Sequence, residues 1–172
     1  MTEPATVRRI QADEGLRWRA LRLRALADTP IAFVDTVEQA SLRPDADWDN
    51  TAAVHSVGCQ SALFIAERSA EWVGVAGGFA HDDGTTTIFT VFIEPAARGQ
   101  RILEALLDAV TAWSLGCGRK DLSLEVAVQN PRALAAYHRL GFTENGKIRP
   151  HPLYPDVTEI EMTRPATIPT SR

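Results

Sequence analysis

The chain has 172 residues, of which 45% are hydrophobic and 23% charged, and its net charge is −4. These values are typical of one compact domain, which we expect to span residues 1–164 with a C-terminal tail at 165–172. An acidic chain without a basic cluster argues against nucleic acid as the main partner. The chain has no apolar run of about 20 residues that could cross a bilayer and no apolar signal region. We therefore expect a cytoplasmic protein that does not bind a membrane.

The two cysteines, Cys59 and Cys117, lie far apart in the sequence. Neither belongs to a close pair of the kind that binds zinc, so we expect no metal. Thiols of cytoplasmic proteins are normally reduced. The sequence therefore predicts that both cysteines are free.

The N-terminal part is predicted to be one strand followed by helices. Thr6 to Ile10 reads as a short strand. A helix opens at Asp13 and ends at Thr29-Pro30, because leucines recur at helical spacing. We expect its arginines to occupy much of its remaining surface: Arg17, Arg19, Arg22 and Arg24. Two further helical stretches cover Val34 to Leu42 and the segment from Pro44 to Gly58.

The middle of the chain is predicted to form three strands: Ala62 to Arg68, Glu71 to Ala80, and Thr85 to Ile93. Turn-like breaks separate them, which predicts a meander of antiparallel hairpins. Pro95 removes a backbone donor and ends the third strand.

The C-terminal part alternates helices and strands. We expect helices at Gly99 to Leu115 and from Asn130 to Gly141, and strands at Leu122 to Val128, Thr143 to Ile148 and Val157 to Thr163. The fold class is α/β (α+β). We expect a mixed, mostly antiparallel twisted sheet of about seven strands, flanked by about four to five helices, with one right-handed parallel crossover.

The turn between Pro95 and the following helix has the chemistry of an anion site. Free amides and the dipole at a helix N-terminus attract anions. Gly99 lets a phosphate approach the backbone, and Arg98 adds donors. An ordinary strand-to-helix turn explains the loop alone equally well. The glycine and lysine patterns of P-loops and dinucleotide folds are not there.

Two motifs resemble those of the GNAT superfamily of N-acetyltransferases, in the correct order and separation. The first, Val91 to Leu103, is similar to the family's Val-x-Pro-x-x-Arg-Gly-x-Gly pyrophosphate motif. The second is similar to the family's strand, asparagine, helical tyrosine and Gly-Phe signature; it comprises Leu124-Glu125-Val126, Asn130, Ala133, Tyr137, Leu140, Gly141 and Phe142. The resemblance covers nearly the whole chain and implies the GNAT fold with acetyl-CoA as the co-substrate.

The resemblance also implies how acetyl-CoA is held. Backbone near Val91 and Ile93 would pair with the pantetheine arm, which Asn130 would touch or organise while capping its helix. Main-chain amides would hold the pyrophosphate, from Arg98, Gly99, Gln100, Arg101, Ile102 and Leu103. Arg101 stands where the family usually has a second glycine or an alanine, and Leu103 replaces another small residue. Backbone amides remain available beside either side chain.

Two residues are the predicted catalytic groups. The resemblance implies that Tyr137 protonates the leaving thiolate or hydrogen-bonds the thioester sulfur, and a phenol is a donor at neutral pH. An aromatic side chain that only packs on the sheet is the alternative. Glu125 is the candidate general base. It projects from its strand opposite to Leu124 and Val126, and its spacing to Asn130 and Tyr137 resembles family members that acetylate protein N-termini, where a glutamate at this place is the proposed base. A solvated glutamate, or a base acting through water, remains open.

The resemblance places the acceptor beside Asp28 to Glu38 and Arg149 to Pro155. The polar groups there that could hold an amine are Asp35, Glu38, Tyr154 and Glu159. We expect direct attack in a ternary complex, on a small-molecule amine or on a peptide or protein amine. A CoA-binding or regulatory module without catalysis, and a purely structural protein, are the rivals. Homodimerisation is a family tendency that we extend to this chain.

Overall fold

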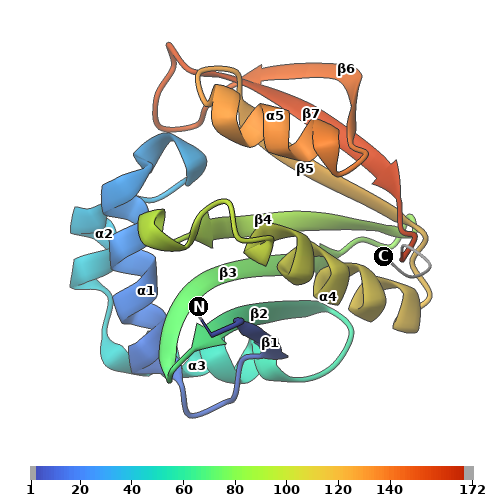
Figure 1. Ribbon diagram of the computed structural model, residues 1–172. Coiled ribbons are helices and arrows are strands. Elements are labelled where there is room, and N and C mark those ends of the chain that lie inside the picture. The colour runs from blue at the N-terminus through green and yellow to red at the C-terminus, as the bar shows by residue number, and fades with distance from the viewer. Residues whose placement is uncertain (1–2, 169–172) are drawn as a thin grey trace.

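The computed structural model describes residues 3–168, and Figure 1 shows the order of its elements. The elements are β1 (Thr6–Arg9), α1 (Gly15–Asp28), the 3-10 helix η1 (Pro30–Ala32), α2 (Val37–Leu42), α3 (Asp45–Ser56), β2 (Ser61–Arg68), β3 (Glu71–Ala80), β4 (Thr85–Ile93), the 3-10 helix η2 (Pro95–Ala97), α4 (Ile102–Gly116), β5 (Asp121–Ala127), α5 (Pro131–Arg139), β6 (Thr143–Pro150) and β7 (Thr158–Pro165).

One seven-stranded sheet runs through the described residues in the order β1-β2-β3-β4-β5-β7-β6. The predicted meander of β2, β3 and β4 is confirmed, with antiparallel pairing throughout. Only β4 and β5 are parallel, joined by the α4 crossover, and they pair only where residues 85–87 meet 121–123. Beyond these pairs the two strands diverge (Figure 1). The mixed, mostly antiparallel fold is therefore as predicted.

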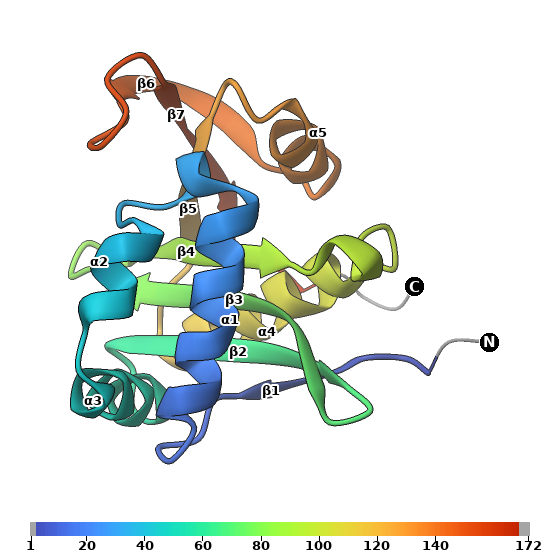
Figure 2. The ribbon, with the colours of Figure 1, turned by 90° about the vertical axis from the view of Figure 1, so that its left-hand side faces the viewer.

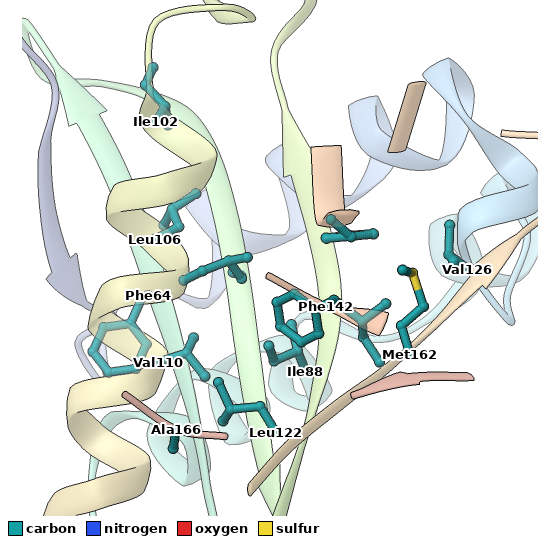
Figure 3. Packing of buried hydrophobic residues seen from close by; sticks show 14 of the residues in the cluster. Phe64, Ile88, Ile102, Leu106, Val110, Leu122, Val126, Phe142, Met162 and Ala166 are labelled. Atoms are coloured by element: carbon teal, nitrogen blue, oxygen red, sulfur yellow. The ribbon is translucent and has the colours of Figure 1, made fainter. Parts of the chain in front are cut away.

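Helices cover both faces of the sheet (Figure 2). On one face, Ile102, Leu106 and Val110 of α4 belong to the same buried cluster as Phe64 and Phe142 (Figure 3). On the other face, α1 and α3 bury large apolar side chains against β2 and β3: Trp18, Leu21, Trp48, Leu63, Ile65 and Val75. No helix in residues 3–168 is long and apolar enough to cross a membrane.

The expected start of α4 at Gly99 is wrong by three residues. Gly99 and Arg101 have positive φ angles of 75° and 62°, and a left-handed residue cannot continue a right-handed helix. The helix therefore begins at Ile102. The loop 98–101 stays outside it as a separate turn.

The prediction of two free cysteines is also wrong. Cys59 and Cys117 form a disulfide with Cα atoms 5.6 Å apart. The C-terminal end of α4 lies beside the loop between α3 and β2, where the Trp113 indole donates a hydrogen bond of 3.1 Å to the Gly58 carbonyl. The sequence alone does not predict this contact, because the two cysteines are brought together only when α4 crosses over between β4 and β5.

The expected C-terminal tail begins inside an ordered element. Pro165 pairs with Asp121 at the end of β7. Ala166 is buried in the core and donates a hydrogen bond of 2.8 Å to the Lys120 carbonyl. The last four residues of that tail, 169–172, lie outside the described residues.

Candidate functional site

Two cavities open where β4 and β5 diverge. The first, of about 340 Å³, is lined by the end of β4, the loop 98–101, the first turn of α4 and α5; we call it the α4–α5 cavity. The second, of about 470 Å³, is lined by α1, α3, β4 and β5; we call it the α1–α3 cavity. Six residues line both cavities: Ala32, Phe33, Val91, Asn130, Ala133 and Tyr137. The two cavities therefore meet at the gap in the sheet.

A turn with free amides closes one end of the α4–α5 cavity. Gly99 and Arg101 bend the chain through left-handed conformations immediately before α4. The first main-chain bond of that helix runs from the Ala105 N–H to the Arg101 carbonyl, at 3.1 Å. The amides from Gly99 to Leu103 precede this bond and lie outside the helix ladder. Successive amides of this kind form a concave site for an anion such as a phosphate.

The Arg98 side chain holds this loop in place. Its Nε donates a hydrogen bond of 3.1 Å to the Ile93 carbonyl, and its terminal nitrogen pairs with the Asp28 carboxylate at the end of α1. Burial favours the neutral form of Asp28, but hydrogen bonds from Thr29 and Arg98 outweigh it and lower the pKa of Asp28. The Arg98 charge is therefore partly neutralised within the protein.

The other polar side chains of the loop are paired with neighbouring residues, and of the two only Arg101 lines the α4–α5 cavity. Gln100 accepts a hydrogen bond of 2.5 Å from Arg68 and does not line either cavity. Arg101 is 68% exposed along its side chain and pairs with Glu104 at 2.8 Å. Binding at this loop therefore falls mainly to the main chain. Of the other predicted cofactor residues, Val91, Ile93, Ile102 and Leu103 line the α4–α5 cavity.

Helix α5 presents Asn130 and Tyr137 to both cavities. The Asn130 side chain accepts a 3.3 Å hydrogen bond from the Ala133 amide, so the predicted cap is confirmed. Tyr137 is only 7% exposed, and its ring lies edge-on to Phe142 at 5.9 Å between centroids. Burial raises the pKa of Tyr137 above its usual value. The phenol therefore keeps its proton, and it packs on the core and faces the cavities at once.

Glu125 faces the α1–α3 cavity from β5, while Leu124 and Val126 enter the core on the opposite side. Partial burial raises the pKa of Glu125, although Arg149 opposes the rise. Arg149 hydrogen-bonds the Glu125 carboxylate and donates a second bond of 3.0 Å to Glu159. Glu125 is thus a carboxylate with increased proton affinity at the edge of a cavity, as a general base requires.

Sequence reasoning missed two of the arginines that line the α1–α3 cavity, Arg22 and Arg43. Arg22 is 9% exposed, so the expectation that it lies on the surface is wrong. It donates hydrogen bonds to Thr90 at 2.9 Å and to Asp35 at 2.5 Å. The spacing of Arg22 from Trp18 and Ala25 places it on the apolar stripe of α1, and that signal could have identified it.

The Thr90 contact supports an irregular piece of β4. Thr90 has a φ of 56°, and the pairing of β3 with β4 shifts register beside it. An extra residue in one strand produces this bulge and re-aims the backbone. Arg22 therefore anchors the bend at which β4 leaves its regular path.

Arg43 and His55 also line the α1–α3 cavity. The Arg43 guanidinium stacks over Trp48 at 4.1 Å from the ring centroid. His55 bonds Ser61 through Nδ1 at 2.8 Å, and burial, with repulsion by Arg9, lowers its pKa. His55 is therefore neutral at physiological pH. No sequence signal distinguished either residue from a surface side chain.

Only some of the residues predicted to bind the acceptor lie at the α1–α3 cavity. Glu159 lines the α1–α3 cavity, and Asp35 borders it through its pair with Arg22. Glu38 is exposed on α2, and Tyr154 stacks against His151; neither lines the two cavities. Residues 3–168 contain no group of three or more histidine, cysteine, aspartate or glutamate side chains arranged to hold a metal.

Comparison with known proteins matches residues 22–142 to the acetyltransferase (GNAT) family. The chain is 31% identical to an IAA acetyltransferase of Azospirillum brasilense over 60% of this chain and 67% of that protein. It is 30% identical to a mycothiol acetyltransferase of Thermobispora bispora over 73% of this chain, but it spans only 42% of that protein. The structure of yncA, a putative acetyltransferase from Salmonella typhimurium with its cofactor acetyl-CoA, superposes with a TM-score of 0.76 at 15% identity, covering 99% of this chain and 98% of that one.

Proposed function

The chain belongs to the GNAT family of acetyltransferases, and we propose that it moves an acetyl group from acetyl-CoA to an amine by direct attack in a ternary complex. The observation that carries this proposal is the meeting of two cavities at Asn130 and Tyr137. One cavity has the phosphate-binding loop, and the other has a carboxylate base. A thioester in the first cavity would face an amine in the second.

The α4–α5 cavity suits acetyl-CoA. The pantetheine arm would lie along β4 at Val91 and Ile93, where β5 has already separated and leaves the main chain without a strand partner on that side. The pyrophosphate would bind the amides of residues 99–103, since the Arg98 amide already donates to the Pro95 carbonyl at 3.4 Å. Arg132 and Arg139, one on each end of α5, line the same cavity and add positive charge near the phosphates.

The chemistry then needs one proton acceptor and one proton donor. The amine nitrogen forms a bond to the acetyl carbon, and the bond from carbon to sulfur breaks. Glu125 takes the amine proton directly or through water. Tyr137 donates to the departing thiolate, and main-chain donors near Ile93 stabilise the oxyanion. Neither cysteine can act as a nucleophile while Cys59 and Cys117 are joined.

Two measurements test the proposal against the rival of a CoA-binding module without catalysis. Acetyl-CoA should raise the melting temperature in a concentration-dependent way. A panel of amines should then stimulate release of free CoA thiol. Binding of acetyl-CoA without stimulated release by any amine would favour the rival. A melting temperature unchanged by acetyl-CoA would exclude both readings.

A further inference from the structure

Arg22 and Arg43 bring two positive charges to one wall of the α1–α3 cavity. Burial lowers the pKa of Arg22, and repulsion by Arg43 lowers it further while Asp35 opposes both. The ring partners of the two guanidinium groups are neighbours: Arg22 lies over Trp18, Arg43 lies over Trp48, and the two indole centroids are 6.3 Å apart. Asp35 is the one carboxylate in residues 3–168 that pairs with either guanidinium group. This wall therefore carries more positive than negative charge.

Arg43 is the arginine that can receive a ligand. It donates one hydrogen bond, of 3.2 Å, to the Thr51 hydroxyl, and its guanidinium stacks on the fully buried Trp48. A guanidinium has five N–H donors in a planar fork that matches a carboxylate. Stacking fixes the plane of that fork in advance. Most of its donors have no protein acceptor within the described chain.

The opposite wall has the complementary charge. Glu125 and Glu159 line the cavity from β5 and β7, with Arg149 between them. A ligand that carries an amine at one end and an anion at the other would satisfy both walls. A purely cationic amine would face the uncompensated charge of Arg43.

We propose that the acceptor is a primary amine whose own carbon skeleton carries a carboxylate, and that Arg43, with Arg22 beside it, binds this carboxylate. The amine then points at Glu125 and the gap in the sheet. The inference rests on the proposed function for the role of the amine. Recognition of the anion is independent of catalysis and can be measured alone.

The first test uses matched acceptors. Alanine, methionine and phenylalanine are offered as free acids and as primary amides, which differ in charge and hardly in size. A charge-assisted hydrogen bond predicts a kcat/KM roughly 10- to 100-fold higher for the acids. Arg43→Gln should remove this preference by raising KM for the acids alone. Arg24→Gln, which removes an exposed arginine of the same helix as Arg22, should leave the preference intact.

The second test does not need turnover. 3-Phenylpropionate should bind the wild type more tightly than 3-phenylpropionamide in a calorimetric or NMR titration, and Arg43→Gln should abolish the difference. Arg43→Lys keeps a positive charge but not the planar fork, so it should retain part of the preference for the acid. A partial preference in Arg43→Lys would exclude misfolding as the cause of its loss in Arg43→Gln. The proposal fails if acid and amide bind equally, or if Arg43→Gln keeps the preference. Selective carboxylate binding without acetyl transfer to any amine would keep this inference and reject the proposed function.

Discussion

The Arg149 guanidinium hydrogen-bonds the Glu125 carboxylate from β6, two strands away across β7. This contact lowers the pKa of Glu125, whereas burial raises it, and burial prevails. The pair thus sets how much of the proposed base is ionised at a given pH. Its arrangement gives a direct test of the role of Glu125.

Arg149→Met should move the acidic limb of the kcat/KM profile to higher pH. Without the cation the pKa of Glu125 rises further, and a base acts only when deprotonated, so activity at pH 6 falls more than activity at pH 8. Glu125→Gln should lower kcat roughly 100-fold or more and remove that limb. Lys147→Met, which removes a charge from the same strand, is the control. Glu125 is not the base if the limb is the same in Arg149→Met and Glu125→Gln as in the wild type.

Tyr137→Phe should lower kcat by about 100-fold and leave the Kd for acetyl-CoA nearly unchanged. Phenylalanine preserves the packing on Phe142, and within residues 3–168 nothing hydrogen-bonds the hydroxyl that it removes. Single-turnover kinetics and calorimetry measure the two effects separately. Normal turnover by the variant would exclude the phenol as the donor to the thiolate.

Gly99→Asp should abolish acetyl-CoA binding. The residue has a φ of 75°, and the new carboxylate would stand beside the amides proposed for the pyrophosphate. Gly99→Asn is the matched control, because asparagine tolerates a left-handed backbone and adds no charge. We expect Gly99→Asn to keep most of the affinity in a thermal-shift titration. Equal affinity of the wild type and Gly99→Asp would refute the assignment of the loop.

Arg101→Gly should raise the free energy of unfolding by about 0.5–1 kcal/mol. Arginine holds a φ of 62° here, which costs an L-residue roughly 1–2 kcal/mol. The greater freedom of glycine in the unfolded chain offsets part of the gain. Arg101→Ala removes the same ion pair with Glu104 but keeps the left-handed strain, so it should not stabilise. Equal denaturation midpoints for the glycine and alanine variants would contradict this account.

Cys117→Ser should lower the free energy of unfolding by about 2–4 kcal/mol, because the disulfide closes a loop with a sequence separation of 58. Reductant should destabilise the wild type by a similar amount and leave Cys117→Ser unaffected. Chemical denaturation with and without reductant measures both effects. A wild type insensitive to reductant would show that the disulfide contributes nothing to stability.

The sequence predicted the elements whose signal is local. Alternation at Leu124, Glu125 and Val126 gave both the strand and the direction in which Glu125 points. The apolar repeat from Ile102 to Val110 gave α4. The start of that helix was misplaced because an arginine, unlike a glycine, does not indicate a left-handed conformation.

Features that depend on the assembled sheet could not be predicted. The partners of Arg22 depend on the assembled fold, because β4 supplies Thr90 and the loop between η1 and α2 supplies Asp35, although its place on the apolar stripe of α1 marks it as buried. Cys59 and Cys117 approach each other only because α4 crosses the sheet. The stacking of Arg43 on Trp48 could not be predicted either, because such a contact produces no periodic pattern in the sequence.

The brief pairing of β4 and β5 has a kinetic consequence. The strands β4 and β5 pair at three positions and then diverge, and this divergence leaves a gap in the sheet. The α4–α5 cavity and the α1–α3 cavity are lined by helices from opposite faces of the sheet and share Tyr137. In the proposed function acetyl-CoA occupies the first cavity and the acceptor occupies the second. Neither substrate has to pass the other on its way in or out. The proposed function therefore predicts that affinity rather than access governs the order of addition, and that spent CoA is exchanged while an acceptor stays in place.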